Sequence, residues 1–402
     1  MSATTQPVSR TSGPVPPTLN LRTLLMIRAL LLARVLWLPA AAYGLSAVTH
    51  IGLLWLMLKP GRYWGPGVAD NLTAWDGRLL LQIAQHGYPD SFTYTPDGKL
   101  TGNNLSFMPL YPALVSFVHD VTGLGFAWSG LVVSHLSFVA LLAVVNSLFG
   151  LMYGRRMAAV ATVLVACAQP MGLVFLMSYT ESLFTALALG TLLAVFRRRW
   201  ILSGVLASLA GLTRPTGVAV TVALAAGVLS YLVWRRRVAV RPLVGLALGC
   251  VGLPSYLAWV GLRVGPLNAW FTIQEAGWGT HWDNGHGVYR LLRDAFTQSD
   301  GWVMISTAVL ITVIFTLTLG AWRSTWMPLA VYGVMVVVMT FGQSNYYHCK
   351  LRLLLPVVVL VVPVSLALAK ARRTTVVTCI VLGTLFSSWY GAYMLTVWQY
   401  TI

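Results

Sequence analysis

Long apolar runs separated by short basic stretches dominate this chain from Val35 to Tyr400. A helix that crosses a bilayer needs about 20 consecutive apolar residues, and many of these runs come near that length. Short loops rich in Lys and Arg stay in the cytoplasm. Threading the chain by such loops predicts about eleven spans, within a range of ten to twelve, near residues 35–58, 128–152, 157–177, 181–196, 200–213, 216–234, 243–262, 303–322, 326–342, 351–369 and 375–397.

Two regions of this pattern admit alternatives. The run from Trp200 to Trp234 is too long for one span, whereas two spans split at Arg214-Pro215 would each be short. A single span would put the arginine triplets before and after it on opposite faces, so we expect the split. The stretch Leu105 to Val118 holds two prolines. We expect it to lie at the outer membrane interface and not to cross.

The same threading assigns the rest of the chain. Residues 1–20 are rich in Ser, Thr and Pro, which predicts a disordered cytoplasmic tail, and residues 21–402 are expected to form a single transmembrane domain. The cytoplasmic loops are a few residues long, whereas two exterior loops, about 59–127 and 263–302, are much longer. Loops of such length are usually functional. The working face is therefore expected on the extracytoplasmic side of the plasma membrane.

Composition narrows the class of protein. The chain is 57% hydrophobic and 9% charged, whereas soluble globular proteins carry about 25% charged residues. The net charge of +17 comes from the basic loops, so it indicates topology and no nucleic-acid partner. The four cysteines offer no pairing framework for disulfides. The sequence has no nucleotide-binding glycine loop and no D-x-D pair. An activated substrate at the outer face must therefore arrive on a lipid.

Asp76 is the first candidate for chemistry. It stands in the first exterior loop, in the motif Trp75-Asp76-Gly77-Arg78 that leads to His86-Gly87-Tyr88. A carboxylate just outside a membrane helix can accept a proton from a hydroxyl group, and the adjacent glycine permits close approach of a substrate. Asp76 could equally be the N-cap of a short helix over residues 77–85.

Other charged residues also stand where apolar runs meet the outer face. The Glu181 carboxylate either takes part in the reaction or stabilises the dipole at the N-terminus of the following span. Arg214 lies in an apolar run, which makes it a functional candidate well shaped for phosphate, although it could also snorkel to the interface. Lys350 and Arg352 could grip a lipid phosphate or simply anchor the chain at the membrane surface. His281 stands near Asp283, but this loop matches no tight metal-ligand pattern.

Several of these motifs occur in an order that resembles the PIG-V family, the second mannosyltransferases of GPI-anchor synthesis, and its bacterial relatives. They are Trp75-Asp76-Gly77 with His86-Gly87-Tyr88, Phe107 to Pro112, Tyr179 to Phe184, and Thr213 to Gly217. The resemblance implies a GT-C membrane glycosyltransferase that passes mannose from polyprenyl-phosphate mannose to an acceptor on the outer face, with Asp76 as the base. The chain departs from the family at Arg78-Leu79-Leu80-Leu81 and at Met108, which bears on the acceptor. The short tail and the basic loops suit a bacterial member of the family. Bacteria make no eukaryotic GPI anchors, so we expect a different glycan or glycolipid acceptor.

These observations combine into one expected reaction. Asp76 would act as general base in a single inverting displacement, while Arg214, Lys350, Arg352 and His348 would balance charge on the leaving lipid phosphate. No metal or other cofactor is expected. The residues expected to contact substrate are Trp75, Gly77, Arg78, His86, Tyr88, Tyr111, Tyr179, Glu181, Arg214, His281, His348, Lys350 and Arg352.

Two other functions stay open at this point. One is a flippase or transporter for lipid-linked sugars, and the other is a transferase that uses a different polyprenyl-phosphate sugar. A transporter usually shows inverted internal repeats, and we find no convincing repeat in this chain. The sequence also leaves open whether an accessory membrane protein is needed.

Overall fold

The fold comes from a computed structural model that describes residues 21–58, 65–236, 238–298, 301–398 and 400, with side chains described from Leu36 on. The expected N-terminal tail, residues 1–20, lies outside the described residues. The described chain is almost entirely helical, and its strands form two small two-stranded sheets.

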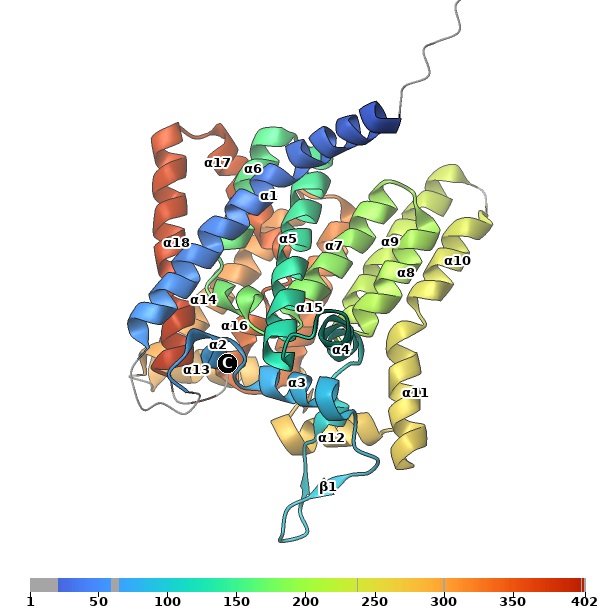
Figure 1. The fold of residues 1–402 in the computed structure, drawn as a ribbon, viewed down its shortest axis with the longest axis vertical. Coiled ribbons are helices and arrows are strands. Elements are labelled where there is room, and N and C mark those ends of the chain that lie inside the picture. Colours follow the sequence, from blue (N-terminus) through green and yellow to red (C-terminus); the bar gives the residue numbers. More distant parts are fainter. Residues whose placement is uncertain (1–20, 59–64, 237, 299–300, 399, 401–402) are drawn as a thin grey trace, which may run out of the picture.

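A bundle of helices makes up most of the molecule (Figure 1). Its members are α1 (Leu21–Met57), α5 (Phe126–Tyr153), α6 (Arg155–Cys167), α7 (Glu181–Phe196), α8 (Trp200–Gly211), α9 (Gly217–Arg235), α10 (Val240–Gly249), α11 (Gly252–Val264), α14 (Trp302–Ala321), α15 (Met327–Gly342), α17 (Val361–Lys370) and α18 (Arg373–Thr396). Short 3-10 turns interrupt the bundle at η2 (Gly172–Leu176) and η4 (Val358–Leu360).

Shorter elements gather at one end of this bundle, the lower end in Figure 1. They are α2 (Val68–Leu72), α3 (Asp76–His86), β1 (Thr93–Tyr94), β2 (Leu100–Thr101), η1 (Asn104–Ser106), α4 (Leu110–Thr122), α12 (Ala269–Trp278), β3 (His281–Trp282), α13 (His286–Thr297), β4 (Gln343–Ser344), η3 (Tyr347–Cys349) and α16 (Lys350–Leu353). β1 pairs with β2 as an antiparallel hairpin, and β3 pairs antiparallel with the distant β4.

The all-α polytopic fold expected from the sequence is confirmed. Within the described residues, six helices are long and apolar enough to cross a membrane, or seven if the bent pair Tyr347–Leu353 and Val358–Lys370 counts as one. Three further apolar helices, α7, α8 and α15, are shorter. Helices occupy all eleven expected ranges. Two expected spans were wrong as single helices. In 157–177, α6 ends at Cys167, and Pro170, which has no N–H group, follows before η2. In 351–369, the pieces Tyr347–Leu353 and Val358–Lys370 are bent by 74°.

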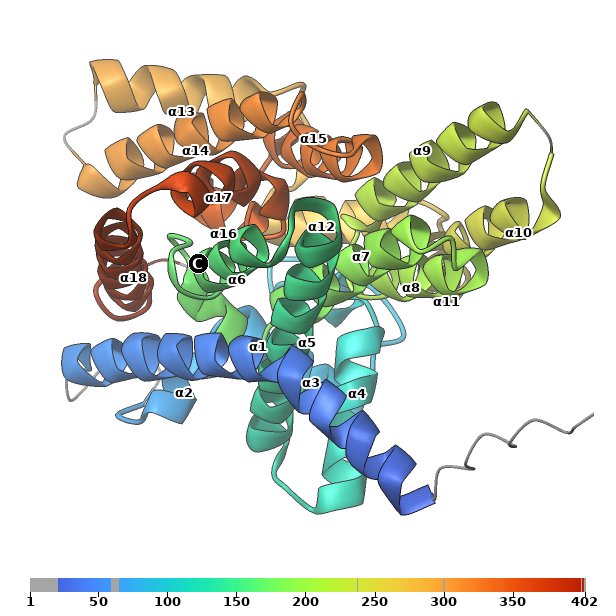
Figure 2. The same cartoon turned by 90° about the horizontal axis from the view of Figure 1, so that it is seen from above.

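The two regions with alternatives are now defined. The long run from Trp200 to Trp234 does form two helices, α8 and α9, and Arg214 lies in the turn between them. The stretch Leu105 to Val118 forms η1 and the first part of α4. Helix α4 runs across the bundle axis, since it is seen end-on in Figure 1 and lengthwise in Figure 2. That orientation suits an interfacial segment.

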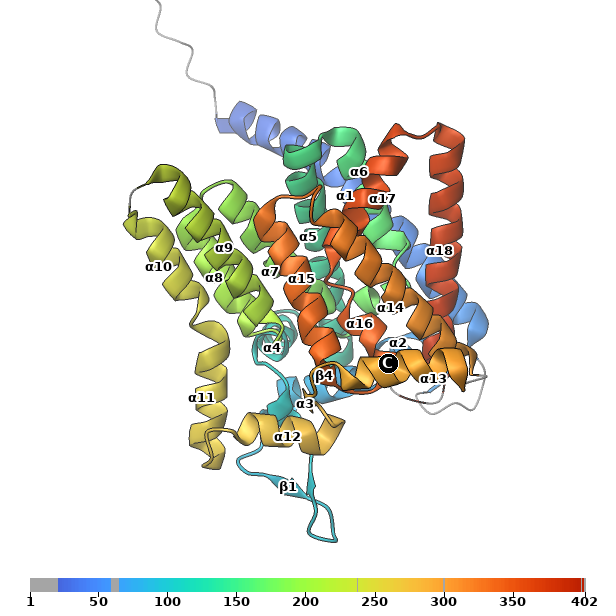
Figure 3. The ribbon, with the colours of Figure 1, turned by 180° about the vertical axis from the view of Figure 1, so that it is seen from behind.

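The basic loops lie at the end of the bundle opposite to the short elements. The connections α5–α6, α9–α10 and α17–α18 stand at the top of Figure 1, and the α14–α15 connection joins them at the top of Figure 3. Each of these connections carries arginine or lysine. Helices α3, α12 and α13, which belong to the long loops, lie at the other end. The two ends of the bundle therefore differ: one carries the basic connections and the other carries the helices of the long loops.

Polar side chains close the break that follows α6. The ring of His50 in α1 is 2.9 Å from the hydroxyl of Ser387 in α18, and that hydroxyl donates to the carbonyl of Gln169 in the break. Ser46 donates to the carbonyl of Ala166 at 2.6 Å. Backbone groups freed inside a membrane domain must find such partners. These bonds connect α1 and α18 to the segment that leads toward α7.

Candidate active site

A cleft of about 170 Å³ opens at the end of the bundle where the short elements gather. Its wall is formed by the start of α3, residues 106–108, residues 179–181, the α8–α9 turn, helix α12 and the segment from the end of α15 to α16. These segments come from both long loops and from four helix ends. The cleft therefore exists only in the folded chain.

The backbone places Asp76 at the edge of this cleft. Asp76 is the first residue of α3, and Trp75 before it has a φ of 55°. Such a φ is strained for a bulky residue, and strain of this kind gathers at functional sites. A Cβ at Gly77 would lie 3.2 Å from the carbonyl oxygen of Ser178. Glycine at this position therefore lets the start of α3 approach the segment that leads into α7.

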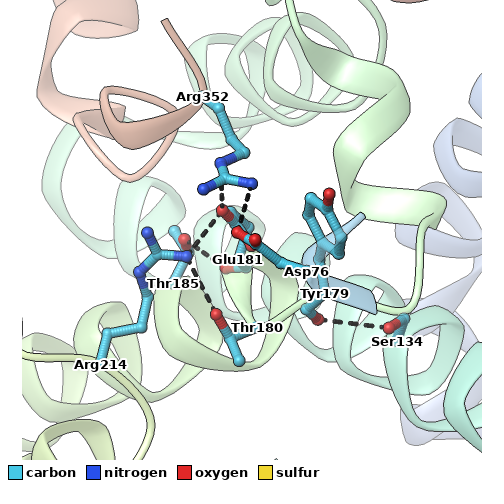
Figure 4. Close-up of polar contacts among 8 residues, drawn as sticks. All are labelled: Asp76, Ser134, Tyr179, Thr180, Glu181, Thr185, Arg214 and Arg352. Carbon is cyan, nitrogen blue, oxygen red and sulfur yellow. Dashed lines mark hydrogen bonds and ion pairs between the residues drawn. The ribbon is translucent and has the colours of Figure 1, made fainter. Parts of the chain in front are cut away.

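Four charged side chains form an ion-pair network in the cleft: Asp76, Glu181, Arg214 and Arg352 (Figure 4). A guanidinium nitrogen of Arg352 lies 2.8 Å from the Asp76 carboxylate, and its Nε lies 3.4 Å from Glu181. Arg214 is 2.6 Å from the same Glu181 oxygen. The side chains of Glu181, Arg352, Arg214 and Asp76 are 2%, 11%, 12% and 18% exposed. Two carboxylates thus balance two guanidinium groups away from bulk water.

The structure shows what three of these residues contact. Trp75, and not Asp76, occupies the N-cap position of α3, and the Asp76 carboxylate contacts Arg352. Glu181 lies in the first turn of α7, where the helix dipole favours it, but its carboxylate also contacts both arginines. Arg214 is held by Glu181 and by a 2.9 Å hydrogen bond that it donates to the Thr180 hydroxyl.

The Tyr179 ring packs beside the network, against Arg352. The Arg352 guanidinium carbon lies 5.1 Å from the centre of its ring, which is a cation–π distance. Burial, helped by the Asp76 carboxylate, raises the pKa of the Tyr179 hydroxyl well above its usual value, so it stays protonated. No described residue forms a hydrogen bond with that hydroxyl. Ser134 donates to the backbone carbonyl of Tyr179 at 3.3 Å and supports the segment (Figure 4).

Lys350 lies close to the network in sequence but belongs to the wall behind the cleft. It is 1% exposed. Its ammonium donates to the carbonyls of Thr340 and Gln343 at 3.1 and 3.0 Å, and to the Asn345 side-chain oxygen at 2.8 Å. Lys350 is absent from the described residues that line the cleft. These contacts tie the end of α15 to α16.

The remaining residues expected at the site lie elsewhere. Exposed His86 and half-buried Tyr88 line a second hollow beside the β1–β2 hairpin, where the Tyr88 hydroxyl donates to the Phe107 carbonyl at 2.9 Å. Tyr111 is fully buried and donates to the Gly130 carbonyl. His348 is buried, with its ring stacked on Tyr346.

Two further expected residues are exposed. Arg78 lies on the surface of α3 and does not line the cleft. His281, in β3, is 3.7 Å from Glu275 and also lies outside the cleft lining. Among the described residues there is no group of three or more His, Cys, Asp or Glu side chains placed to hold a metal ion.

The structure also adds cleft residues that the sequence did not single out. Gln274 and Trp278 come from α12, and Gln343 and Asn345 come from the segment after α15. Gln274 and Trp278 belong to the second long loop, whereas Gln343 and Asn345 belong to the short connection after α15. Three of the four are amide side chains beside apolar runs, which is a usable sequence signal.

Comparisons with known proteins concern the fold. No family model and no curated protein matches the chain. Among solved structures, ArnT from Cupriavidus metallidurans bound to undecaprenyl phosphate matches with a TM-score of 0.51 and 15% identity, over 84% of this chain and 62% of ArnT. The oligosaccharyltransferase AglB from Archaeoglobus fulgidus, in complex with an inhibitory peptide and a dolichol-phosphate, gives 0.48 and 12%, over 90% and 56%.

This chain thus spans about three fifths of the length of ArnT. ArnT has the GT-C fold, which agrees with the fold expected from the sequence. At 15% identity the likeness to ArnT concerns the fold alone. The chain is an all-α, polytopic membrane protein with the GT-C fold.

Proposed function

We propose that this protein is a glycosyltransferase of PIG-V type that transfers mannose from polyprenyl-phosphate mannose to a glycan or glycolipid acceptor. The observation that carries the proposal is the ion-pair network, which places a carboxylate and two guanidinium groups in one cleft of a GT-C fold. ArnT is bound to undecaprenyl phosphate in its solved structure, which supports an isoprenoid phosphate as the donor anchor. The order of the sequence motifs supports mannose as the sugar.

Asp76 acts as general base in this reaction. A sugar hydroxyl is too weak an acid to ionise at neutral pH, so it needs a base as the new bond forms. The acceptor oxygen attacks the anomeric carbon, the hydroxyl proton passes to Asp76, and the bond to the phosphate oxygen breaks. The electron pair leaves with the polyprenyl phosphate. A single displacement inverts the anomeric centre, so a β-linked donor gives an α-mannoside.

Arg352 links donor binding to the release of the Asp76 carboxylate. In the structure its guanidinium contacts the carboxylate that the reaction requires. While the carboxylate is held by this guanidinium, it is less accessible to an acceptor hydroxyl. The phosphate of an incoming donor competes for the same guanidinium, and arginine binds phosphate in a bidentate manner. We propose that the donor phosphate takes Arg352 from Asp76 and so frees the base.

Glu181 and Arg214 support this exchange. Glu181 contacts both guanidinium groups, so it can hold Arg352 in place when Asp76 is released. Arg214 then brings a second cation to the charge that grows on the leaving phosphate. In this proposal the two arginines balance that charge without a metal ion. An accessory protein forms no part of it.

The arrangement of the basic loops supports an extracytoplasmic cleft. They lie at the end of the bundle opposite α3 and α12 (Figure 3), and such loops face the cytoplasm. We therefore propose a plasma-membrane protein with a cytoplasmic N-terminus. Cysteines introduced singly at Asp97 and Arg373 in a cysteine-free variant test this proposal in intact cells. An impermeant maleimide should label position 97 only, and labelling of position 373 alone would contradict the proposed sidedness.

Activity is tested with purified full-length protein, radiolabelled polyprenyl-phosphate mannose and a membrane extract that supplies acceptors. A labelled glycan or glycolipid is expected to form. Turnover with polyprenyl-phosphate glucose or arabinose, and none with mannose, would contradict the sugar assignment. Movement of labelled donor across proteoliposomes without any transferred product would instead identify a flippase.

A further inference from the structure

The segment between α15 and α16 forms one wall of the cleft and is held on both sides. On one side, Gln343 and Ser344 pair with Trp282 and His281 of β3. The Trp282 ring packs so closely on Gly342 that a Cβ there would lie 2.2 Å from it. On the other side, Lys350 donates two hydrogen bonds to Gln343 and Asn345 of this segment and a third to Thr340 near the end of α15. The segment is therefore fixed in position before any substrate arrives.

Asn345 is the side chain of this segment whose orientation Lys350 determines. An ammonium group only donates hydrogen bonds, so the atom of Asn345 that lies 2.8 Å from Lys350 is the amide oxygen. The amide is planar, and its NH2 group consequently stands on the other side. Asn345 is half-buried and lines the cleft. No described residue accepts a hydrogen bond from this NH2 group.

We propose that Asn345 is a substrate-binding residue whose NH2 group donates a hydrogen bond to an oxygen of the donor headgroup, either of the phosphate or of the sugar. Lys350 is the positioning residue that fixes the amide in this orientation. The proposal rests on the function proposed above, because it takes a lipid-linked sugar phosphate as the ligand of the cleft. It also gives Lys350 a place behind the site and not on the phosphate.

The structure explains why Lys350 suits this task. Its three N–H groups each have one acceptor, so the ammonium is fully satisfied although it is buried. Two of these acceptors are backbone carbonyls near the end of α15, which lack partners within that helix. An amide held in this way loses little freedom when it binds a ligand, and pre-organisation of this kind increases affinity.

The test separates the donor function of Asn345 from its contact with Lys350. Asn345→Asp keeps an oxygen for Lys350 but removes the NH2 group, whereas Asn345→Ala removes both without adding charge. Asn268→Asp makes the same charge change at an exposed position outside the cleft. Affinities for undecaprenyl phosphate and for polyprenyl-phosphate mannose are measured on full-length protein in nanodiscs, together with the melting midpoint.

We expect Asn345→Asp to melt like the wild type and to bind donor at least about tenfold more weakly, the loss typical of a hydrogen bond to a charged group. Asn345→Ala should also bind more weakly and should melt lower. A loss with both probes identifies the phosphate as the acceptor, and a loss with the glycosylated probe alone identifies the sugar. Both results support the proposal.

Four results would overturn it. If Asn345→Asp binds both probes with wild-type affinity, the NH2 group of Asn345 donates no hydrogen bond to the donor. Wild-type affinity in Asn345→Ala, with a loss in Asn345→Asp, shows charge repulsion only, as does an equal loss in Asn268→Asp. A wild-type protein that binds neither probe refutes the proposed function and this inference together. In contrast, donor affinity that is unchanged in both Asn345 variants refutes this inference but not the proposed function.

Discussion

Lys350 and Arg352 are two buried cations of the same short helix α16, and the structure gives them different surroundings. The Lys350 ammonium contacts two backbone carbonyls and one amide oxygen. The Arg352 guanidinium contacts two carboxylates and an aromatic ring at the cleft. Lys350 does not line the cleft, whereas Arg352 and both of its carboxylate partners do, so an incoming phosphate can compete for the guanidinium. Position and partners, more than the charge itself, therefore separate a wall residue from a site residue.

The largest effect is expected from Asp76→Asn, which removes one of the two carboxylates that contact Arg352. Turnover should fall by about 10²- to 10⁴-fold, the range for loss of a general base. Binding of undecaprenyl phosphate should become tighter, because the phosphate no longer competes with Asp76 for Arg352. Asp97→Asn, an exposed change in the same loop, serves as the control. Near-normal turnover in Asp76→Asn would refute the role of the base, and unchanged binding would refute the exchange at Arg352.

Arg352→Met is expected to have the next largest effect. Removal of one partner of a buried ion pair costs about 3–5 kcal/mol of stability, because the carboxylates are left without their counter-ion. Donor affinity should fall at least about 30-fold, as is typical when a charged contact of 2 kcal/mol or more is lost. Arg290→Met on exposed α13 is the matched control.

The double variant Asp76→Asn with Arg352→Met sharpens this comparison. It should recover part of the lost thermal stability, because it removes both ends of one contact. It should not recover turnover. An Arg352→Met variant with wild-type donor affinity would place Arg352 among the wall residues, beside Lys350.

Lys350→Met should mainly lower stability. It leaves the Thr340 and Gln343 carbonyls without their donor, which costs about 3 kcal/mol when two buried acceptors lose their partner. Thermal unfolding in detergent measures this loss, with the exposed Lys370→Met as control. Donor affinity should fall less than in Arg352→Met, because only the orientation of Asn345 is lost. The reverse order of affinities would contradict the division between wall and site.

The smallest effect is expected from Tyr179→Phe. The hydroxyl has no described hydrogen-bond partner, and the phenylalanine ring keeps the contact with Arg352. The free energy of unfolding should change by no more than about 0.5 kcal/mol, and turnover by less than about threefold. Tyr179→Ala, which also removes the ring, should lose more of both. A large loss of turnover in Tyr179→Phe would show that the hydroxyl itself contacts substrate.

The membrane class, the helical positions and the asymmetry of the loops could all be predicted from the sequence. Hydrophobic runs and basic stubs are local features, and a helix forms its hydrogen bonds within its own segment. The break at Pro170 could also have been predicted from the sequence, since proline cannot continue a helix. The apolar run was long enough for one span, so a single helix was expected instead. The motifs also located Asp76, Glu181, Arg214 and Arg352 as candidates.

Which of these candidates meet depends on the packing of distant segments. Asp76, Glu181, Arg214 and Arg352 belong to four separate segments, and their contacts depend on how α3, α7, the α8–α9 turn and α16 pack. Side-chain partners of this kind are set by long-range packing, which no local pattern encodes. For the same reason the sequence could not separate Lys350 from Arg352, since both are cations beside the same apolar run. The two residues are distinguished by their partners in the folded chain: oxygens of carbonyl and amide groups for Lys350, and carboxylates for Arg352.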